Sequence, residues 1–188
     1  MKDRECKIAA AGYDVISQYG VRRVTMADVA EAAGVSRQTV YNVFPNREAL
    51  LAAVVRYHFN SKWSAIRNCI TPDLDRKQRF QALLDTLVIE SWHSLQAMPH
   101  ADELELEIAT TIKDEIVEIH AEARRNICEF LLPYQDALNS HDMTANGLGD
   151  LLHHSIMGLK LGSTTLEEIQ CVTAAMLACL MAVTEPRH

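Results

Sequence analysis

The chain has 188 residues, of which 48% are hydrophobic and 23% are charged, and its formal net charge is −7. This length suits one compact unit or a small domain joined to a larger one. No apolar run approaches the roughly 20 residues that cross a bilayer, and the amino terminus lacks the apolar core of a signal peptide. We therefore expect a cytoplasmic protein with no membrane partner.

The charge is distributed unevenly along the chain. Residues 1–70 hold ten Lys and Arg against six Asp and Glu, whereas residues 71–188 hold eight against nineteen. Affinity for phosphate groups depends on the local field rather than on the net charge, so the amino-terminal part remains a candidate for nucleic-acid binding. The asymmetry also favours a chain of two parts.

Residues 24–44 have the pattern of a helix-turn-helix, and a helix with one apolar face precedes them. Thr25 is placed to cap the first helix, and Asp28 stands three residues later, where its carboxylate can reach back to the cap. Gly34 supplies the permissive backbone that a sharp turn needs. Ser36 then caps a second short helix that runs to about residue 44. This arrangement predicts a helix presented to a DNA groove.

The second helix has one apolar face and one polar face. Val40 and Phe44 lie four residues apart and are expected to point into the core. Arg pairs with guanine, and Gln or Asn with adenine, in the major groove, while hydroxyl groups and a cation at the start of the next helix suit phosphates. The residues expected to contact DNA are Thr25, Ser36, Arg37, Gln38, Thr39, Tyr41, Asn42 and Arg47.

Beyond this segment the apolar spacing is helical and no stretch alternates like a strand, so the fold class is predicted to be all-α. Prolines mark the expected helix ends. The predicted helices cover residues 46–68, a segment around residues 80–95, residues 102–132 with an interruption near Thr110 and Thr111, a segment around residues 148–159, and residues 165–183.

The last helix is apolar nearly all round, and such a helix must be covered on both sides. A second subunit can cover the side that one chain leaves open, which predicts a two-fold homodimer with a four-helix bundle; the alternative is a helix buried in a monomer. A dimer would read both halves of an inverted-repeat operator. The expected interface residues are Leu148, Leu152, Ile156, Leu159, Val172, Ala175, Met176 and Cys179.

Two acid–histidine pairs suggest a different function. Glu90 and His93, like Asp150 and His153, lie three residues apart, a spacing that holds metal in di-iron helical bundles. The alternatives are therefore a helical metal-dependent enzyme or a metal-responsive regulator, and a helical adaptor that does not bind DNA. The sequence lacks a glycine-rich phosphate loop, a nucleophile elbow and a triad, so we expect neither an enzyme nor a bound cofactor.

Residues 1 to about 50 resemble the amino-terminal domain of the TetR (tetracycline-repressor) family of transcriptional regulators. The chain departs from the usual pattern at Gln38, where glycine is frequent, at Val43, where histidine is usual, and at Arg47, where lysine is usual. The matching residues are Gly20, Thr25, Val29, Ala30, Ala33, Gly34, Val35, Ser36, Thr39, Val40, Tyr41, Phe44, Arg47, Glu48, Ala49 and Leu50.

The resemblance implies a helix-turn-helix DNA-binding domain at residues 1–47 and a helical effector-binding and dimerisation domain at residues 48–188. It also implies a repressor that a small molecule releases from DNA, by favouring a spacing of the two reading helices that does not fit the operator. The candidate walls of the effector pocket are Trp63, Trp92, His93, Met98, Ile112, Ile116 and Met157. Such aromatic and methionine side chains suit an apolar or planar effector.

Overall fold

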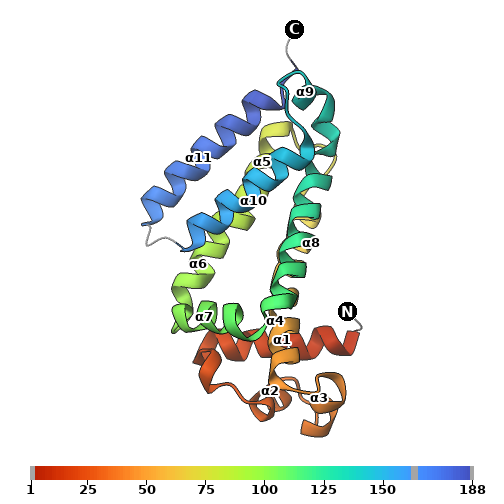
Figure 1. Cartoon of the computed structure of the whole chain (residues 1–188), viewed down its shortest axis with the longest axis vertical. Helices are drawn as coiled ribbons and strands as arrows, with labels where there is room; N and C mark the ends of the chain where they lie inside the picture. Colours follow the sequence, from red (N-terminus) through yellow and green to blue (C-terminus); the bar gives the residue numbers. More distant parts are fainter. Residues whose placement is uncertain (1–2, 162–164, 187–188) are drawn as a thin grey trace. The chain divides into compact units, whose positions relative to one another are not determined.

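The computed structural model describes residues 3–161 and 165–186, and every regular element within these ranges is helical (Figure 1). The predicted all-α class is confirmed. The chain divides into two compact units: unit 1 comprises the residues up to Ser61 together with Ser94–His120, and unit 2 comprises Lys62–His93 together with the residues from Ala121 onward. The expected boundary at residue 47 concerns function and stays a prediction.

Unit 1 contains the helix-turn-helix and a later segment of the chain. Its core joins Ile8, Val29 and Val40, each 0% exposed, with Ile112 and Ile119, each 1% exposed. The elements are α1 (Asp3–Tyr19), η1 (Val21–Arg23), α2 (Met26–Ala32), α3 (Arg37–Val43), the first part of α4 (Arg47–Cys69), α7 (Ala101–Thr111) and the start of α8 (Lys113–Leu131). Residues far apart in the sequence therefore build one core.

A glycine lets α1 approach α4 closely within this core. A Cβ atom at Gly12 would lie 2.7 Å from Cγ2 of Val54, a separation that real side chains do not adopt. Close packing at this point fixes how the first helix lies on the base of α4.

Unit 2 is built around Phe80, Leu83, Leu84 and Leu138, each 0% exposed. Phe80 also packs its ring against Tyr134, with the ring centroids 5.0 Å apart. The elements are the rest of α4, α5 (Arg76–Leu84), η2 (Asp85–Ile89), α6 (Glu90–Ala97), the rest of α8, η3 (Leu132–Tyr134), α9 (Gln135–Asn139), α10 (Ala145–Leu161) and α11 (Leu166–Val183).

The helix ends follow the prolines as expected. α4, α6 and α8 end at Cys69, Ala97 and Leu131, each two or three residues before a proline, because the residue before proline is steered out of the helical region. The interruption expected near Thr110 and Thr111 is also present, since α7 ends at Thr111. The sequence did not reveal that η2, a π-helical turn, joins α5 to α6.

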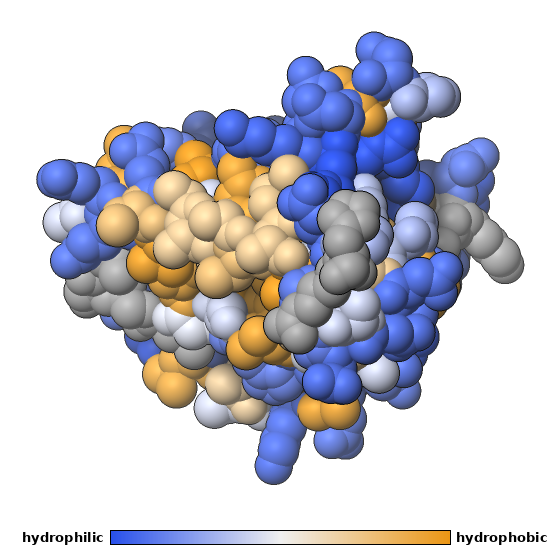
Figure 2. All heavy atoms as spheres, turned by 90° about the horizontal axis from the view of Figure 1, so that it is seen from above, coloured by the Kyte–Doolittle hydropathy of each residue, from blue (hydrophilic) through white to orange (hydrophobic). Residues whose placement is uncertain are grey.

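α11 leaves much of its apolar surface open. Its buried residues are Ile169, Thr173, Leu177 and Leu180. Figure 2, seen from above relative to Figure 1, shows hydrophobic residues gathered in a surface patch. The small or apolar residues that α11 exposes are Leu166, Cys171, Val172, Ala174, Ala175, Ala178, Cys179 and Ala182. The expectation of a helix apolar nearly all round is therefore met, with one side covered by its own chain.

α11 also has the length and composition of a membrane-crossing helix, the one such helix among the described residues. Its mean hydropathy is 1.6 over 18 residues, of which 22% are buried. This finding qualifies the expectation that no segment of the chain resembles a spanning helix. The buried residues of α11 pack within unit 2. A core helix of a globular protein can have the same length and mean hydropathy as a membrane-crossing helix.

Three residues that we expected at a subunit interface lie in the core of unit 2 instead. Leu148, Leu152 and Ile156 are each 5% exposed within the single chain. They occupy the inward face of α10, so this part of the expectation needs correction. The outward face of α10 is marked by Leu151, which is 58% exposed.

Candidate nucleic-acid interface

The turn between α2 and α3 is held by the local contacts that the sequence predicts. The Thr25 hydroxyl accepts from the backbone N–H of Asp28 at 3.3 Å, and the Asp28 carboxylate accepts from the backbone N–H of Thr25 at 2.8 Å. Gly34 has a φ of 63°, in the left-handed region that favours glycine. The Ser36 hydroxyl accepts from the backbone N–H of Thr39 at 3.1 Å and caps α3.

The capping box gives the stability of unit 1 a pH dependence. Hydrogen bonds from the Thr25 side chain and then from its backbone lower the pKa of Asp28 below its ordinary value of 3.8. Since the charged form is favoured in the folded state, its contribution is present above that value and is lost as the pH falls through the lowered pKa. The urea midpoints of wild type and Asp28→Ala should therefore differ at neutral pH and converge in acid. Glu31→Ala, at an exposed position on the same helix, should show no such convergence.

α3 separates an inward face from an outward face. Val40 is 0% exposed and Phe44 is 7% exposed, so both lie in the core of unit 1. Tyr41 is 48% exposed. The outward side chains are those of Arg37, Gln38, Tyr41 and Asn42, as the sequence predicts. Together they present a guanidinium, two amides and a phenol, which can form hydrogen bonds with base edges and phosphate oxygens.

The hydroxyl groups at the edge of this face already have partners. Ser36 Oγ and Thr39 Oγ1 lie 2.9 Å apart, and Thr39 is half-buried. The Thr25 hydroxyl donates to the Asp28 carboxylate at 2.7 Å. Their first role is therefore to hold the turn, and a contact of these three residues with DNA stays a prediction.

Arg47 has a role that the sequence did not reveal. Its Nη2 donates to the backbone carbonyl of Val21 at 2.7 Å, and its Nη1 donates to the carboxylate of Glu107 in α7. Both ends of the guanidinium are engaged within unit 1, and the expected contact of Arg47 with a phosphate stays a prediction. Within unit 1, Arg47 connects α7 to the turn that follows α1. A second, exposed pair, Arg22 and Glu103, lies 3.5 Å apart between η1 and α7.

The residues expected to line one effector pocket are divided between the two units. Met98, Ile112 and Ile116 pack in unit 1, where Ile112 is 1% exposed. Trp63 is 4% exposed in the core of unit 2, and Trp92 packs against that core. The remaining two, His93 and Met157, belong to unit 2, where His93 is exposed and Met157 half-buried. A shared pocket for all seven stays a prediction.

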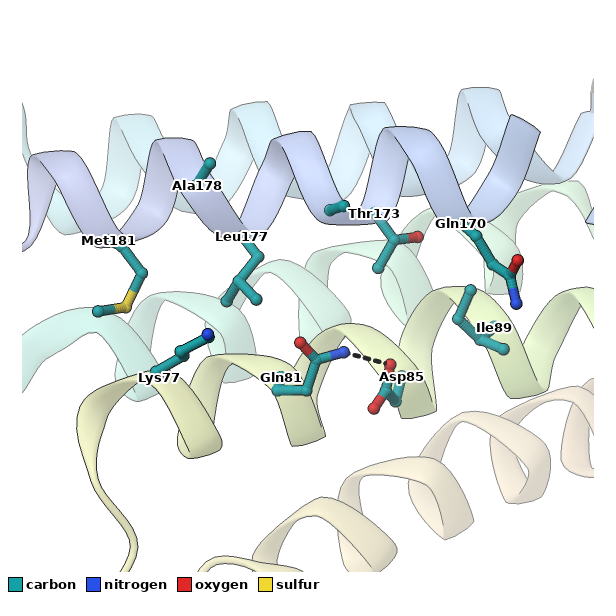
Figure 3. Close-up of a pocket in the computed structure, with 10 residues that line it drawn as sticks. Lys77, Gln81, Asp85, Ile89, Gln170, Thr173, Leu177, Ala178 and Met181 are labelled. Carbon is teal, nitrogen blue, oxygen red and sulfur yellow. Dashed lines mark hydrogen bonds between the residues drawn. The ribbon is translucent and has the colours of Figure 1, made fainter. Parts of the chain in front are cut away.

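Among its described residues, unit 2 contains hollows lined by its own residues alone. A groove of about 750 Å³ lies between α5 with η2 and α11, and Figure 3 shows the amide of Gln81 across from Leu177, with a hydrogen bond of 2.7 Å from Gln81 to Asp85. A second hollow, of about 400 Å³, has Trp63, Phe130 and Tyr134 in its wall. Trp63, from the expected set, thus lines a hollow within unit 2.

The two acid–histidine pairs do not form a metal cluster among the described residues, where no group of three or more His, Cys, Asp or Glu is placed to hold an ion. Glu90 lies 3.2 Å from Lys62 Nζ, and Asp150 lies 3.7 Å from Arg124 Nε. His153 is 6% exposed in unit 2. Each carboxylate therefore faces a cation, and within the described residues neither pair has a third ligand beside it.

The helix-turn-helix segment matches a known family. Residues 8–54 match the family profile described as "Bacterial regulatory proteins, tetR family". An uncharacterized HTH-type transcriptional regulator of Mycobacterium tuberculosis is 40% identical over 52 residues, which is 28% of either chain. The HTH-type transcriptional repressor KstR2 of Rhodococcus jostii is 25% identical over 112 residues, or 58% of this chain and 54% of KstR2. The matches thus span about half or less of these relatives.

The similarity of fold extends over nearly the whole chain. A crystal structure from Rhodococcus sp., assigned in its description to the TetR-family transcriptional regulators, superposes with a TM-score of 0.74. The superposition covers 98% of this chain and 100% of the other, at 20% sequence identity. At this identity the likeness establishes the fold, while the amino-terminal match carries the relation in sequence.

Proposed function

We propose that this chain is a transcription regulator of the TetR family of bacterial regulatory proteins and that it reads double-stranded DNA with α3. The observation that carries the proposal is the outward face of α3, where Arg37, Gln38, Tyr41 and Asn42 are exposed while Val40 and Phe44 anchor the helix. This face lies within the segment that matches the family profile. The excess of Lys and Arg before residue 71 favours the approach of phosphates.

The working form in this proposal is a homodimer that binds an inverted-repeat operator in the cytoplasm. One seven-residue helix contacts too few bases for selectivity, and a dyad doubles the contacts. The surface for the second copy is the exposed face of α11, around Ala175 and Cys179, with Leu151 and Leu159 of α10 beside it in the chain's last two helices. A protein partner covers such a face, which explains an apolar α11 without a membrane.

The direction of control in this proposal is repression relieved by a small molecule. KstR2 is named as a repressor, and unit 2 offers hollows with apolar walls for an effector. Thermal-shift measurements on the full chain with a metabolite library identify candidates, because a ligand that binds the folded state raises the midpoint. A candidate counts only if it also lowers the affinity for operator DNA.

The test of the proposed function has two measurements on the purified full chain. Selection from a randomised duplex library at moderate salt should enrich an inverted repeat, and size-exclusion chromatography with light scattering should give the mass of a dimer. Failure to enrich any sequence would contradict the DNA-binding assignment. A monomer at micromolar concentration would contradict the dimer.

Arg37→Ala should weaken and relax operator recognition. The guanidinium is exposed on α3, and loss of a bidentate contact to a base costs about 1–3 kcal/mol per half-site. Fluorescence anisotropy with the selected duplex and with single-base variants measures both effects. Arg4→Ala removes the same charge from an exposed position on α1 and should leave base preference unchanged. Equal loss in the two variants would mean that Arg37 does not read a base.

A further inference from the structure

Two amide side chains on the outward face of α3 are bonded to each other. Gln38 Nε2 donates to Asn42 Oδ1 at 3.0 Å, and both residues are exposed. They lie four residues apart, so one stands directly above the other on the helix surface. The bond therefore favours one orientation of the Gln38 amide before any ligand binds.

The bond leaves a defined set of polar groups on Gln38. A primary amide has two N–H donors and one carbonyl acceptor, and Asn42 uses a single donor. Gln38 Oε1 and the second N–H remain for a partner. Asn42 Oδ1 accepts this one bond and keeps a second lone pair, and its Nδ2 keeps both donors.

We propose that Gln38 reads one adenine in each half-site through this free amide edge, and that Asn42 is the positioning residue that aims it. The proposal rests on the proposed function, because it requires that α3 enters the major groove. Gln38 is the second residue of α3, and the amino-terminal residues of a recognition helix are those that reach base edges.

Adenine matches the groups that Gln38 keeps. Its N6 amino group donates to a carbonyl oxygen and its N7 accepts from an N–H, so both contacts form at once. Guanine presents acceptors at both N7 and O6, and O6 would face the Gln38 carbonyl without a hydrogen. The remaining bases offer a single matching group in the major groove. The edge therefore selects an A·T pair in one orientation.

The proposed contact with adenine depends on Gln38, a position at which glycine is frequent in the family that residues 1 to about 50 resemble. A glycine would leave Asn42 without this partner and the base without an amide. Relatives with glycine here should accordingly lack this adenine preference, whatever else they read.

The test uses the full-length protein and the inverted repeat that it enriches from a random library. Selection is repeated with Gln38→Ala, and the position whose base preference disappears is the one that Gln38 reads; we expect adenine there. That adenine is then replaced by 7-deazaadenine, which lacks the N7 acceptor but pairs normally with thymine. Wild type should lose about tenfold in affinity per half-site, and Gln38→Ala should lose nothing further.

Asn42 variants separate positioning from direct contact. Asn42→Leu removes the acceptor at similar size, so the penalty for 7-deazaadenine should fall severalfold. Asn42→Asp keeps an acceptor for Gln38 but adds a charge near the phosphates, so overall affinity should fall while the penalty persists. Gln18→Ala removes an exposed amide from α1 and should behave as wild type. Both side chains of the pair are exposed, so the variants should melt like wild type.

The outcomes distinguish failure of this inference from failure of the proposed function. No enriched sequence would overturn the proposed function and this inference with it. An enriched operator with no position sensitive to Gln38→Ala, or with a base other than adenine there, would overturn the inference alone. If Asn42→Leu loses as much affinity for the 7-deazaadenine duplex as wild type does, Gln38 contacts the adenine without positioning by Asn42. That result would overturn the role of Asn42.

Discussion

Ala175→Glu should separate the two subunits and lower operator affinity by about a hundredfold or more, because each reading helix then binds without its tethered partner. Ala175 is exposed within one chain, so the monomer tolerates the new side chain, whereas a dimer would bury an unpaired carboxylate against an apolar face. Light scattering measures the mass, and titration of the selected duplex measures the affinity. The expected result is a folded monomer with weak DNA binding.

Asn68→Glu provides the matched control, since it introduces the same charge at an exposed position of α4 in unit 2. This variant should remain a dimer with near wild-type affinity. A dimeric Ala175→Glu protein would contradict the assignment of α11 to the interface, even if DNA binding itself were confirmed.

Arg47→Met should destabilise the protein by about 2 kcal/mol, since it removes charged hydrogen bonds from groups that are partly shielded from water. The Glu107 side chain is 18% exposed, and the Val21 carbonyl would lose the guanidinium that now donates to it. Urea unfolding followed by circular dichroism measures the loss. Glu107→Gln should be milder, and the double variant should lose less than the sum of the single changes.

Arg56→Met is the matched control for this prediction. Arg56 and Glu118 form a longer pair of 3.7 Å in unit 1, and the Glu118 side chain is 77% exposed, so the loss should stay below about 1 kcal/mol. If Arg47 acted chiefly on a phosphate, Arg47→Met would leave stability unchanged and would instead lower the salt dependence of DNA binding.

The parts of unit 1 that the sequence predicts are those determined by residues close together in the chain. Thr25 and Asp28 form their capping box, Gly34 takes its left-handed turn, and Val40 faces the core. Each depends on a spacing of a few residues and on the chemistry of one side chain. The outward face of α3 follows from the same periodicity, because a helix that buries Val40 must expose the residues around Tyr41.

Contacts between distant residues left no comparable signal. Arg47 and Glu107 are 60 residues apart, and nothing in the spacing of either residue predicts that they meet. The bond from Gln38 to Asn42 has a helical spacing, but spacing alone does not say whether two exposed amides bind each other or point apart. The packing of Ile112 and Ile119 with the helix-turn-helix likewise depends on the folded topology.

The apolar stripe of α10 led to a wrong assignment for a related reason. Leu148, Leu152 and Ile156 form a regular helical face, and a regular face requires a partner without saying which one. Unit 2 itself covers them, since each is 5% exposed. In α11 the exposed cysteines and alanines lie on the side opposite the buried residues. That exposed side can be identified only when the structure shows which residues of α11 are buried.

The core of unit 1 is built from two separate segments of the chain, and this limits which fragments of the protein keep that core intact. A fragment that stops near residue 61 would lack Ile112 and Ile119 and would strip Arg47 of its acidic partner. Truncations or chimeras meant to carry the DNA-reading part alone must therefore splice in residues 94–120, or replace their apolar contacts with designed substitutions. A fragment that keeps the whole core of unit 1 therefore consists of two separate stretches of the polypeptide.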